Sequence, residues 1–118
     1  MASTPSKTGD RFNTGKPEVT MVLEARHAVS GAARVLSFGK QKYSRGNWRK
    51  GMQHTIPADC LARHLMAWLS GEDVDPESGE LHVDHITVNA LFLAEFVRTH
   101  PEMDDRPFIN GVPQESVR

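Results

Sequence analysis

Apolar residues recur at steps of three and four along three separate stretches of this sequence, and the segments between them are rich in glycine, proline and charged residues. Such steps place apolar side chains on one side of an α-helix, whereas a half-buried strand would need strict alternation. The pattern predicts helices over residues 18–38, 58–70 and 80–98. We therefore expect an all-α fold: a small helical domain of about three main helices with long loops. Such a domain has a thin core, which favours completion by oligomerisation.

Glycine and proline set the expected ends of these helices. Pro17 precedes the first helix and Gly39 ends it, while Gly31 inside it either weakens the helix or allows another helix to pack closely. Pro57 opens the second helix and Gly71 ends it. The two inner connections should therefore be loops rather than continuous helix.

The remaining segments define the expected organisation of the chain. Residues 1–16 are polar and without periodicity, which predicts a flexible N-terminal arm. Residues 17–100 form the predicted helical domain that carries the site. Residues 40–57 read as an irregular loop with one helical turn near its start. Residues 101–118 read as an irregular C-terminal tail that docks on the body or on a partner chain.

Composition limits the compartment and the partners. A chain of 118 residues has room for one domain, and its net charge of −1 gives no case for binding duplex nucleic acid or a membrane surface. The single cysteine, Cys60, excludes an intramolecular disulfide and suits a reducing cytoplasm. No apolar run approaches the ~20 residues of a membrane span, and the N-terminal segment lacks the apolar stretch of a signal peptide. We expect a cytoplasmic protein.

Three histidines lie on either side of an acidic loop. His64 falls on the second predicted helix, His82 and His85 fall three residues apart on the third, and Glu72 and Asp75 lie in the loop between. Imidazoles and carboxylates that converge from two helices suit a divalent metal ion such as Mn²⁺, Zn²⁺ or Mg²⁺. We interpret the histidines as metal ligands and the two carboxylates as catalytic groups. An internal hydrogen-bond network would satisfy the same polar groups.

A basic segment with interleaved aromatic residues precedes the histidines. Between residues 40 and 50 it carries five cations, together with Tyr43 and Trp48. Cations beside aromatic rings can hold phosphates and stack a base, although a solvated basic loop has the same composition. Five cations make a small footprint, which fits a nucleotide better than a duplex. The expected substrate-binding residues are Lys42, Tyr43, Asn47, Trp48, Arg49 and Arg63.

Taken together, these segments resemble a known family. The residues that carry the resemblance are Phe38-Gly39, Lys42-Tyr43, Asn47-Trp48, Gly51, Arg63-His64, Gly71-Glu72, Asp75, Ser78-Gly79, His82, His85 and Asn89. In type and spacing they are similar to the N-terminal domain of the dATP/dGTP diphosphohydrolases of phages and bacteria, over about residues 15–97. The resemblance implies removal of pyrophosphate from a purine deoxynucleoside triphosphate. It also implies a distant kinship with the all-helical pyrophosphohydrolases of the MazG type, which hold magnesium with ExxE and ExxD motifs.

The sequence departs from the MazG pattern at one point that bears on the metal. His82-x-x-His85 stands where an ExxD motif would be expected, and imidazole favours zinc, manganese or iron over magnesium.

The leading hypothesis is a metal-dependent phosphohydrolase that acts on purine (deoxy)nucleoside triphosphates and releases pyrophosphate. The alternative is a non-catalytic phage protein that binds or sequesters nucleotides. A third is a structural or partner-interaction protein whose histidines hydrogen-bond within the core.

Overall fold

A computed structural model describes residues 7–12 and 14–115 of the chain. Its elements, in chain order, are α1 (Thr20–Leu23), α2 (Arg26–Lys42), the 3₁₀ helix η1 (Asn47–Lys50), α3 (Thr55–Leu69), α4 (His82–Thr99), the 3₁₀ helix η2 (Pro101–Met103), β1 (Phe108–Ile109) and β2 (Val112–Pro113). The two strands form one small antiparallel pair. The three long helices confirm the expected small, mainly helical fold.

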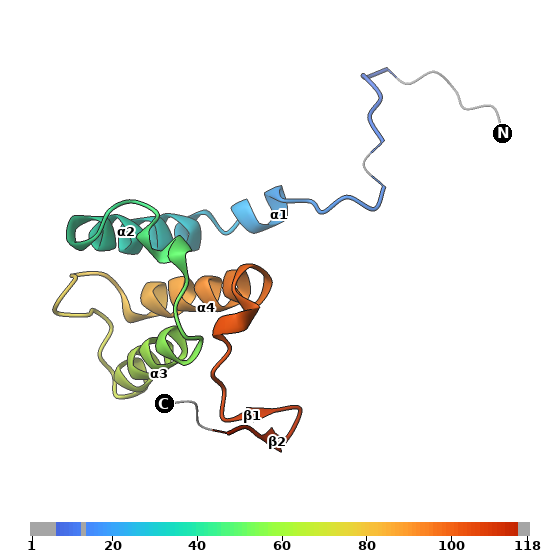
Figure 1. Cartoon of the computed structure of the whole chain (residues 1–118). Coiled ribbons are helices and arrows are strands. Elements are labelled where there is room, and N and C mark those ends of the chain that lie inside the picture. The colour runs from blue at the N-terminus through green and yellow to red at the C-terminus, as the bar shows by residue number, and fades with distance from the viewer. Residues whose placement is uncertain (1–6, 13, 116–118) are drawn as a thin grey trace.

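Helix α4 is the centre of the domain, with α2 packed on one side and α3 on the other (Figure 1). Phe96 of α4 and Pro57 of α3 are fully buried, and Val35 of α2 and Val88 of α4 are buried apolar side chains as well. Trp48 of η1 stacks on Phe92, with ring centroids 4.8 Å apart. The apolar core is therefore thin and follows the length of α4.

The first predicted helix differs from the observed structure at both ends. Helix α1 ends at Leu23, and Ala25, with ψ of 55°, separates it from α2. Helix α1 buries no residue, so no tertiary packing offsets the cost of extending a single helix through this point. At the other end α2 passes through Gly39 and stops when Tyr43 becomes extended. Gly39 is in open space, and a glycine there weakens the helix without ending it.

Gly31 accounts for the close approach of α2 to α4. A Cβ atom built on Gly31 would overlap the carboxylate of Asp84, a buried residue in the first turn of α4. Only a residue without a side chain fits at this contact. Of the two interpretations of Gly31, close helix packing is the one that the structure confirms.

Helix α3 begins two residues earlier than Pro57, which lies in its first turn, where a missing N–H costs little. The carboxylate of Asp105 accepts hydrogen bonds from the backbone N–H of Thr55 at 2.9 Å and from its hydroxyl at 2.6 Å. Asp105 thus caps α3 from the C-terminal tail. The segment after α4 therefore docks on the helical body. This was one of the two predictions for the tail, the other being a partner chain.

The segments expected to be irregular contain short elements. The expected loop 40–57 holds the end of α2 and all of η1, and the expected tail 101–118 holds η2 and the hairpin. Asn110 and Gly111 both have positive φ between the paired strands, as a tight hairpin turn requires. In the predicted arm 1–16, residues 1–6 and 13 lie outside the described residues, and the others are exposed without helix or strand. No helix in the described ranges is long and apolar enough to cross a membrane.

Candidate functional site

The loop between α3 and α4, residues 70–81, determines how the histidines meet. Val74 and Leu81 form an isolated antiparallel bridge, and the N–H of Asp75 donates to the carbonyl of Glu80 at 2.8 Å. The N–H of His82 donates to the carbonyl of Asp73 at 2.9 Å, so the loop folds back on itself where α4 starts. This closure brings the first turn of α4 against the C-terminal half of α3, the part that carries His64.

His64, His82 and His85 form one compact group, here called the histidine cluster. The Nδ1 atoms of His64 and His82 are 2.8 Å apart, within hydrogen-bond distance. The rings of His64 and His85 are stacked, with centroids 4.3 Å apart and planes 4° from parallel. His82 and His85 are buried. The structure thus brings together the three residues that sequence spacing had grouped.

Each of the two carboxylates predicted to be catalytic holds one imidazole of the cluster. Glu72 Oε1 lies 2.7 Å from His82 Nε2. Asp75 Oδ2 lies 3.3 Å from His85 Nε2, and the hydroxyl of Ser78 lies between these two groups. Its oxygen is 2.7 Å from His85 Nε2 and donates to Asp75 Oδ2 at 2.8 Å. Glu72 and Asp75 therefore fix the orientation of two rings.

Burial and hydrogen bonding act in opposite directions on these groups. Burial lowers the pKa of His64, and the neighbouring His85 lowers it further. Burial also lowers the pKa of His85, against the opposing effect of Asp75. For Asp75, burial acts to raise the pKa, but hydrogen bonds from the Ser78 hydroxyl and from backbone amides outweigh it and leave the pKa below its usual value. His64 and His85 are therefore neutral near pH 7 while Asp75 is ionised, a state in which an imidazole can accept a proton.

The donor types in the cluster suit a divalent metal ion, but their arrangement does not converge on one point. Among residues 7–12 and 14–115, no group of three or more His, Cys, Asp or Glu side chains is arranged to hold a metal. Two nitrogens bound to one tetrahedral zinc would lie roughly 3.3 Å apart, whereas the two Nδ1 atoms of His64 and His82 are separated by a hydrogen-bond distance of 2.8 Å. The observed geometry is that of the internal hydrogen-bond network.

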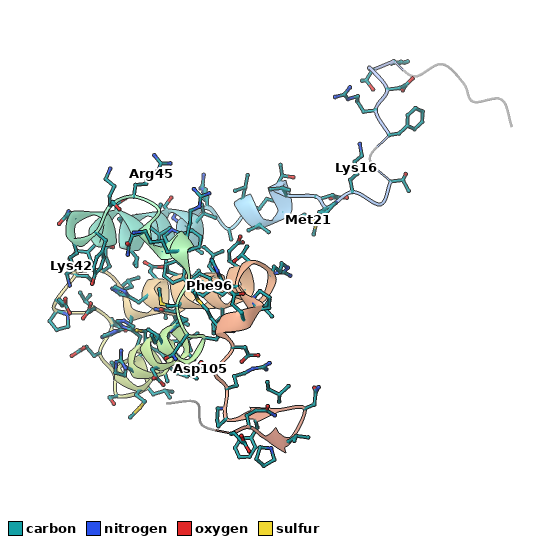
Figure 2. All side chains as sticks on the ribbon, viewed as in Figure 1. Lys16, Met21, Lys42, Arg45, Phe96 and Asp105 are labelled. Atoms are coloured by element: carbon teal, nitrogen blue, oxygen red, sulfur yellow. The ribbon has the colours of Figure 1, made fainter. Side chains whose placement is uncertain are left out.

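Part of the predicted substrate-binding set lies beside the cluster. Lys42 lies at the end of α2 (Figure 2). It forms an ion pair with Glu77 of the loop, and this interaction raises the pKa of Lys42. Arg63 precedes His64 on α3, and its guanidinium donates to Cys60 Sγ at 3.2 Å. Tyr43, the next residue after α2, is 61% exposed. These three residues surround the same end of the helical body as the acidic loop.

The other part of the set lies towards the opposite end of α4. Trp48 packs on Phe92 and Phe96, and the backbone carbonyl of Arg49 accepts a hydrogen bond from His100 Nε2 at 2.9 Å. Trp48, Arg49, Glu95, Phe96 and Thr99 line a cavity of about 310 Å³. Asn47, half-buried, opens η1 on the same segment. The structure therefore separates Asn47, Trp48 and Arg49 from the histidine cluster, because Phe96 is eleven residues, or about 16 Å of helix, beyond His85.

Sequence reasoning did not single out Ser78 as a functional residue. It lies three residues after Asp75, within a turn that Asp75 opens, and short polar side chains in such turns bond to one another and to nearby amides. The Asp-Pro-x-Ser spacing was a visible signal for that turn. It could not indicate that the hydroxyl would also contact His85, because that contact depends on the loop folding back on α4.

These observations define a class of protein: a small α-helical domain with a cluster of three histidines at an acidic loop. Two carboxylates of that loop each hold one of the histidines. The family described as dATP/dGTP diphosphohydrolase, N-terminal, matches residues 6–106. The chain belongs to this family. It is also 32% identical, over 106 residues, to a protein named dATP/dGTP diphosphohydrolase from Salmonella phage PMBT28.

The extent of that match limits what carries over. It includes 90% of this chain and 36% of the relative, so the chain spans about a third of the length of the phage protein. No solved structure matches the chain significantly. The sequence comparisons therefore establish the family of this chain. They do not by themselves assign to it the activity of the longer phage protein.

Proposed function

We propose that this chain is a nucleotide phosphohydrolase that acts on purine deoxynucleoside triphosphates and releases pyrophosphate. One observation carries the proposal: a histidine cluster in which burial lowers the pKa of His64 and His85, next to the Asp75 carboxylate, whose pKa is also lowered, and to the cation of Lys42. Membership of the dATP/dGTP diphosphohydrolase family and the name of the phage relative support the choice of substrate.

The proposed reaction is attack of water on the α-phosphorus. A P–O bond to the water oxygen forms, the bond from the α-phosphorus to the pyrophosphate oxygen breaks, and the carboxylate of Glu72 or Asp75 takes the water proton. The products are a deoxynucleoside monophosphate and pyrophosphate. Lys42 and Arg63, near the cluster, are the cations proposed to hold phosphate oxygens.

We propose that Tyr43 or Trp48 faces the base or the sugar of the nucleotide, with Asn47 and Arg49 beside Trp48. Tyr43 directly follows Lys42 and is 61% exposed, which suits a base next to phosphates held near the histidine cluster. Trp48 lies farther along α4, beside Phe92 and Phe96.

A divalent metal ion is part of the proposal as a cofactor held by His64, His82 and His85 once their rings have turned from their present hydrogen bonds. When bound, it would screen phosphate charge and acidify a water molecule. Manganese and zinc suit the imidazole donors better than magnesium does. Elemental analysis of purified protein, compared with a His85→Ala variant, tests this part separately from activity.

A turnover screen tests the function. Purified protein incubated with dGTP, dATP and the ribonucleotides, each with Mn²⁺, Zn²⁺ or Mg²⁺, should release pyrophosphate, and His64→Ala should abolish the release. Tight binding in calorimetry without product would instead establish the second candidate, a protein that binds or sequesters nucleotides. That candidate is favoured by the same basic and aromatic residues, which need no reacting water.

We also propose that the domain acts as a homo-oligomer in the cytoplasm, of the host cell if the chain is phage-encoded like its relative. Large apolar side chains on the outer faces of α1 and α3 are exposed, among them Val22, Met66 and Leu69, each 67% exposed or more. Exposed apolar side chains that form a contiguous patch mark an interaction site. Light scattering on the purified protein should give a mass that is a multiple of 13.1 kDa.

A further inference from the structure

Two cations of α2 each pair with a carboxylate of the loop that leads into α4. Arg34 Nε lies 3.2 Å from Glu80 Oε2, and Arg34 Nη2 lies 4.0 Å from Asp84 Oδ2 in the first turn of α4. Eight residues after Arg34, the ammonium group of Lys42 forms an ion pair with Glu77. The two contacts between α2 and the loop, Arg34 with Glu80 and Lys42 with Glu77, are here called the clasp.

The two cations of the clasp lie in one row along α2. Positions 34, 38 and 42 are four residues apart, and side chains at this spacing share one side of a helix. Phe38 occupies the middle of the row, and Lys42 Nζ lies 5.2 Å from the centre of its ring. Eight residues of helix extend about 12 Å, which is the distance along α2 between the ends of the row. The row therefore presents two separate positive charges to the loop.

The clasp adjoins the histidine cluster. The hydroxyl of Ser78 accepts a hydrogen bond from the N–H of Glu80 at 3.2 Å and lies 2.7 Å from His85 Nε2. The guanidinium of Arg34 approaches Asp84, the residue directly before His85. A phosphate chain bound to the row of cations on α2 would thus lie next to the cluster.

Both ion pairs of the clasp are open to solvent. The side chains of Lys42 and Glu77 are 48% and 67% exposed, and that of Arg34 is 56% exposed. Exposed pairs of this kind are scarcely more stable than the two separate hydrated ions. A triphosphate carries several charged oxygens, and a guanidinium can bind two of them at once. A triphosphate is therefore a stronger partner for these cations than single carboxylates are.

We propose that Arg34 and Lys42 bind the triphosphate of the nucleotide, and that Glu77 and Glu80 occupy the same two cations until the nucleotide displaces them. This inference rests on the proposed function. It adds Arg34 to the phosphate-binding residues and gives the two loop carboxylates the role of competitors. Asp84, whose side chain is 9% exposed, stays beside Arg34 and keeps the guanidinium in place after Glu80 has left.

Calorimetry with inorganic tripolyphosphate in the presence of a chelator measures this site without a base and without a metal ion. Arg34→Ala and Lys42→Ala should each weaken binding at least about five-fold, because each removes hydrogen bonds to a charged group. Glu77→Gln should have the opposite effect and tighten binding about two- to five-fold, because the carboxylate that competes for Lys42 is gone.

Asp73→Asn is the matched control for Glu77→Gln. Asp73 is an exposed residue of the same loop, and it has no ion pair in the part of the chain that the structure describes. Its replacement removes the same negative charge, so it measures the effect of net charge alone. Glu77→Gln should gain more affinity than Asp73→Asn does. In the Lys42→Ala background this extra gain should vanish, because the cation for which Glu77 competes is absent.

The results separate the phosphate site from the competition and from hydrolysis. Absence of tripolyphosphate binding by the wild type, or equal binding by Arg34→Ala, would overturn the assignment of Arg34. A gain from Glu77→Gln no larger than that from Asp73→Asn, or the same gain in the Lys42→Ala background, would overturn the competition. If the tripolyphosphate results are as expected but the wild type releases no pyrophosphate from dGTP, the proposed function is refuted and the phosphate site stands.

Discussion

Two glycines of the same helix should respond in opposite ways to substitution by alanine. At Gly31 the added Cβ would overlap the carboxylate of Asp84, whereas at Gly39 it would meet no atom within 4 Å. Both residues lie within α2, so the change in helix propensity is nearly the same at the two positions. Gly39→Ala is therefore a matched control for the packing contact at Gly31.

The magnitudes follow from two opposing effects. Replacing glycine by alanine in a helix gains about 0.5–1 kcal/mol. Forcing extra volume into a filled contact costs about 1–3 kcal/mol. Gly39→Ala should thus raise the melting temperature by about 2–8 °C, given about 4–8 °C per kcal/mol for a domain of this size. At Gly31 the packing cost exceeds the propensity gain by about 1 kcal/mol at mid-range, so Gly31→Ala should lower the melting temperature by about 5–10 °C.

Thermal unfolding followed by circular dichroism measures both variants, and a double-mutant cycle with Asp84→Ala identifies the cause. In the Asp84→Ala background, Gly31→Ala should cost at least about 1 kcal/mol less than it does in the wild type, because the overlapping carboxylate is absent. A Gly31→Ala protein as stable as Gly39→Ala would refute the close contact between α2 and α4 on which the position of the loop and cluster depends.

Three further predictions concern the site. Burial lowers the pKa of His64 and His85, so these residues take up protons at a higher pH in the unfolded chain than in the folded chain. The melting temperature should therefore fall as the pH drops below about 6.5. The fall should be smaller in His85→Asn. Lys42→Ala should weaken nucleotide binding several-fold in calorimetry. The melting temperature should change by only a few degrees, because the exposed ion pair between Lys42 and Glu77 adds little stability. Equal binding by Lys42→Ala and wild type would show that Lys42 does not belong to the phosphate site. In Trp68→Phe, which leaves Trp48 as the sole tryptophan, dGTP should quench the fluorescence, and unchanged fluorescence at saturating nucleotide would place the base elsewhere.

The helices were predictable because their apolar faces pack on one another, and periodicity reports such faces directly. The interruption of the helix at Ala25 could not be predicted. Val19, Val22 and Leu23 continue the periodic pattern, but in the described part of the chain α1 buries none of its residues. The turn at Asn110-Gly111 could have been predicted, since this dipeptide favours the positive φ angles of a tight hairpin.

The grouping of His64, His82 and His85 was predictable for a different reason. Two helices joined by a loop of twelve residues must run side by side, and the histidines lie near the joined ends. The ring orientations were beyond the sequence, because they depend on Ser78 and Glu72 reaching particular nitrogens. For the same reason the sequence could not show that Trp48 packs on Phe92 and Phe96 rather than facing the cluster.

We propose above that a purine deoxynucleoside triphosphate is hydrolysed at the histidine cluster of this chain. Phosphorus NMR of the purified protein with dGTP or dATP and Mn²⁺ tests it most directly, because pyrophosphate and inorganic phosphate give separate signals. We expect pyrophosphate and the monophosphate in equal amounts from the wild type and neither from His64→Ala. No product from the wild type with any of the three metals, or the same product from both proteins, would contradict it.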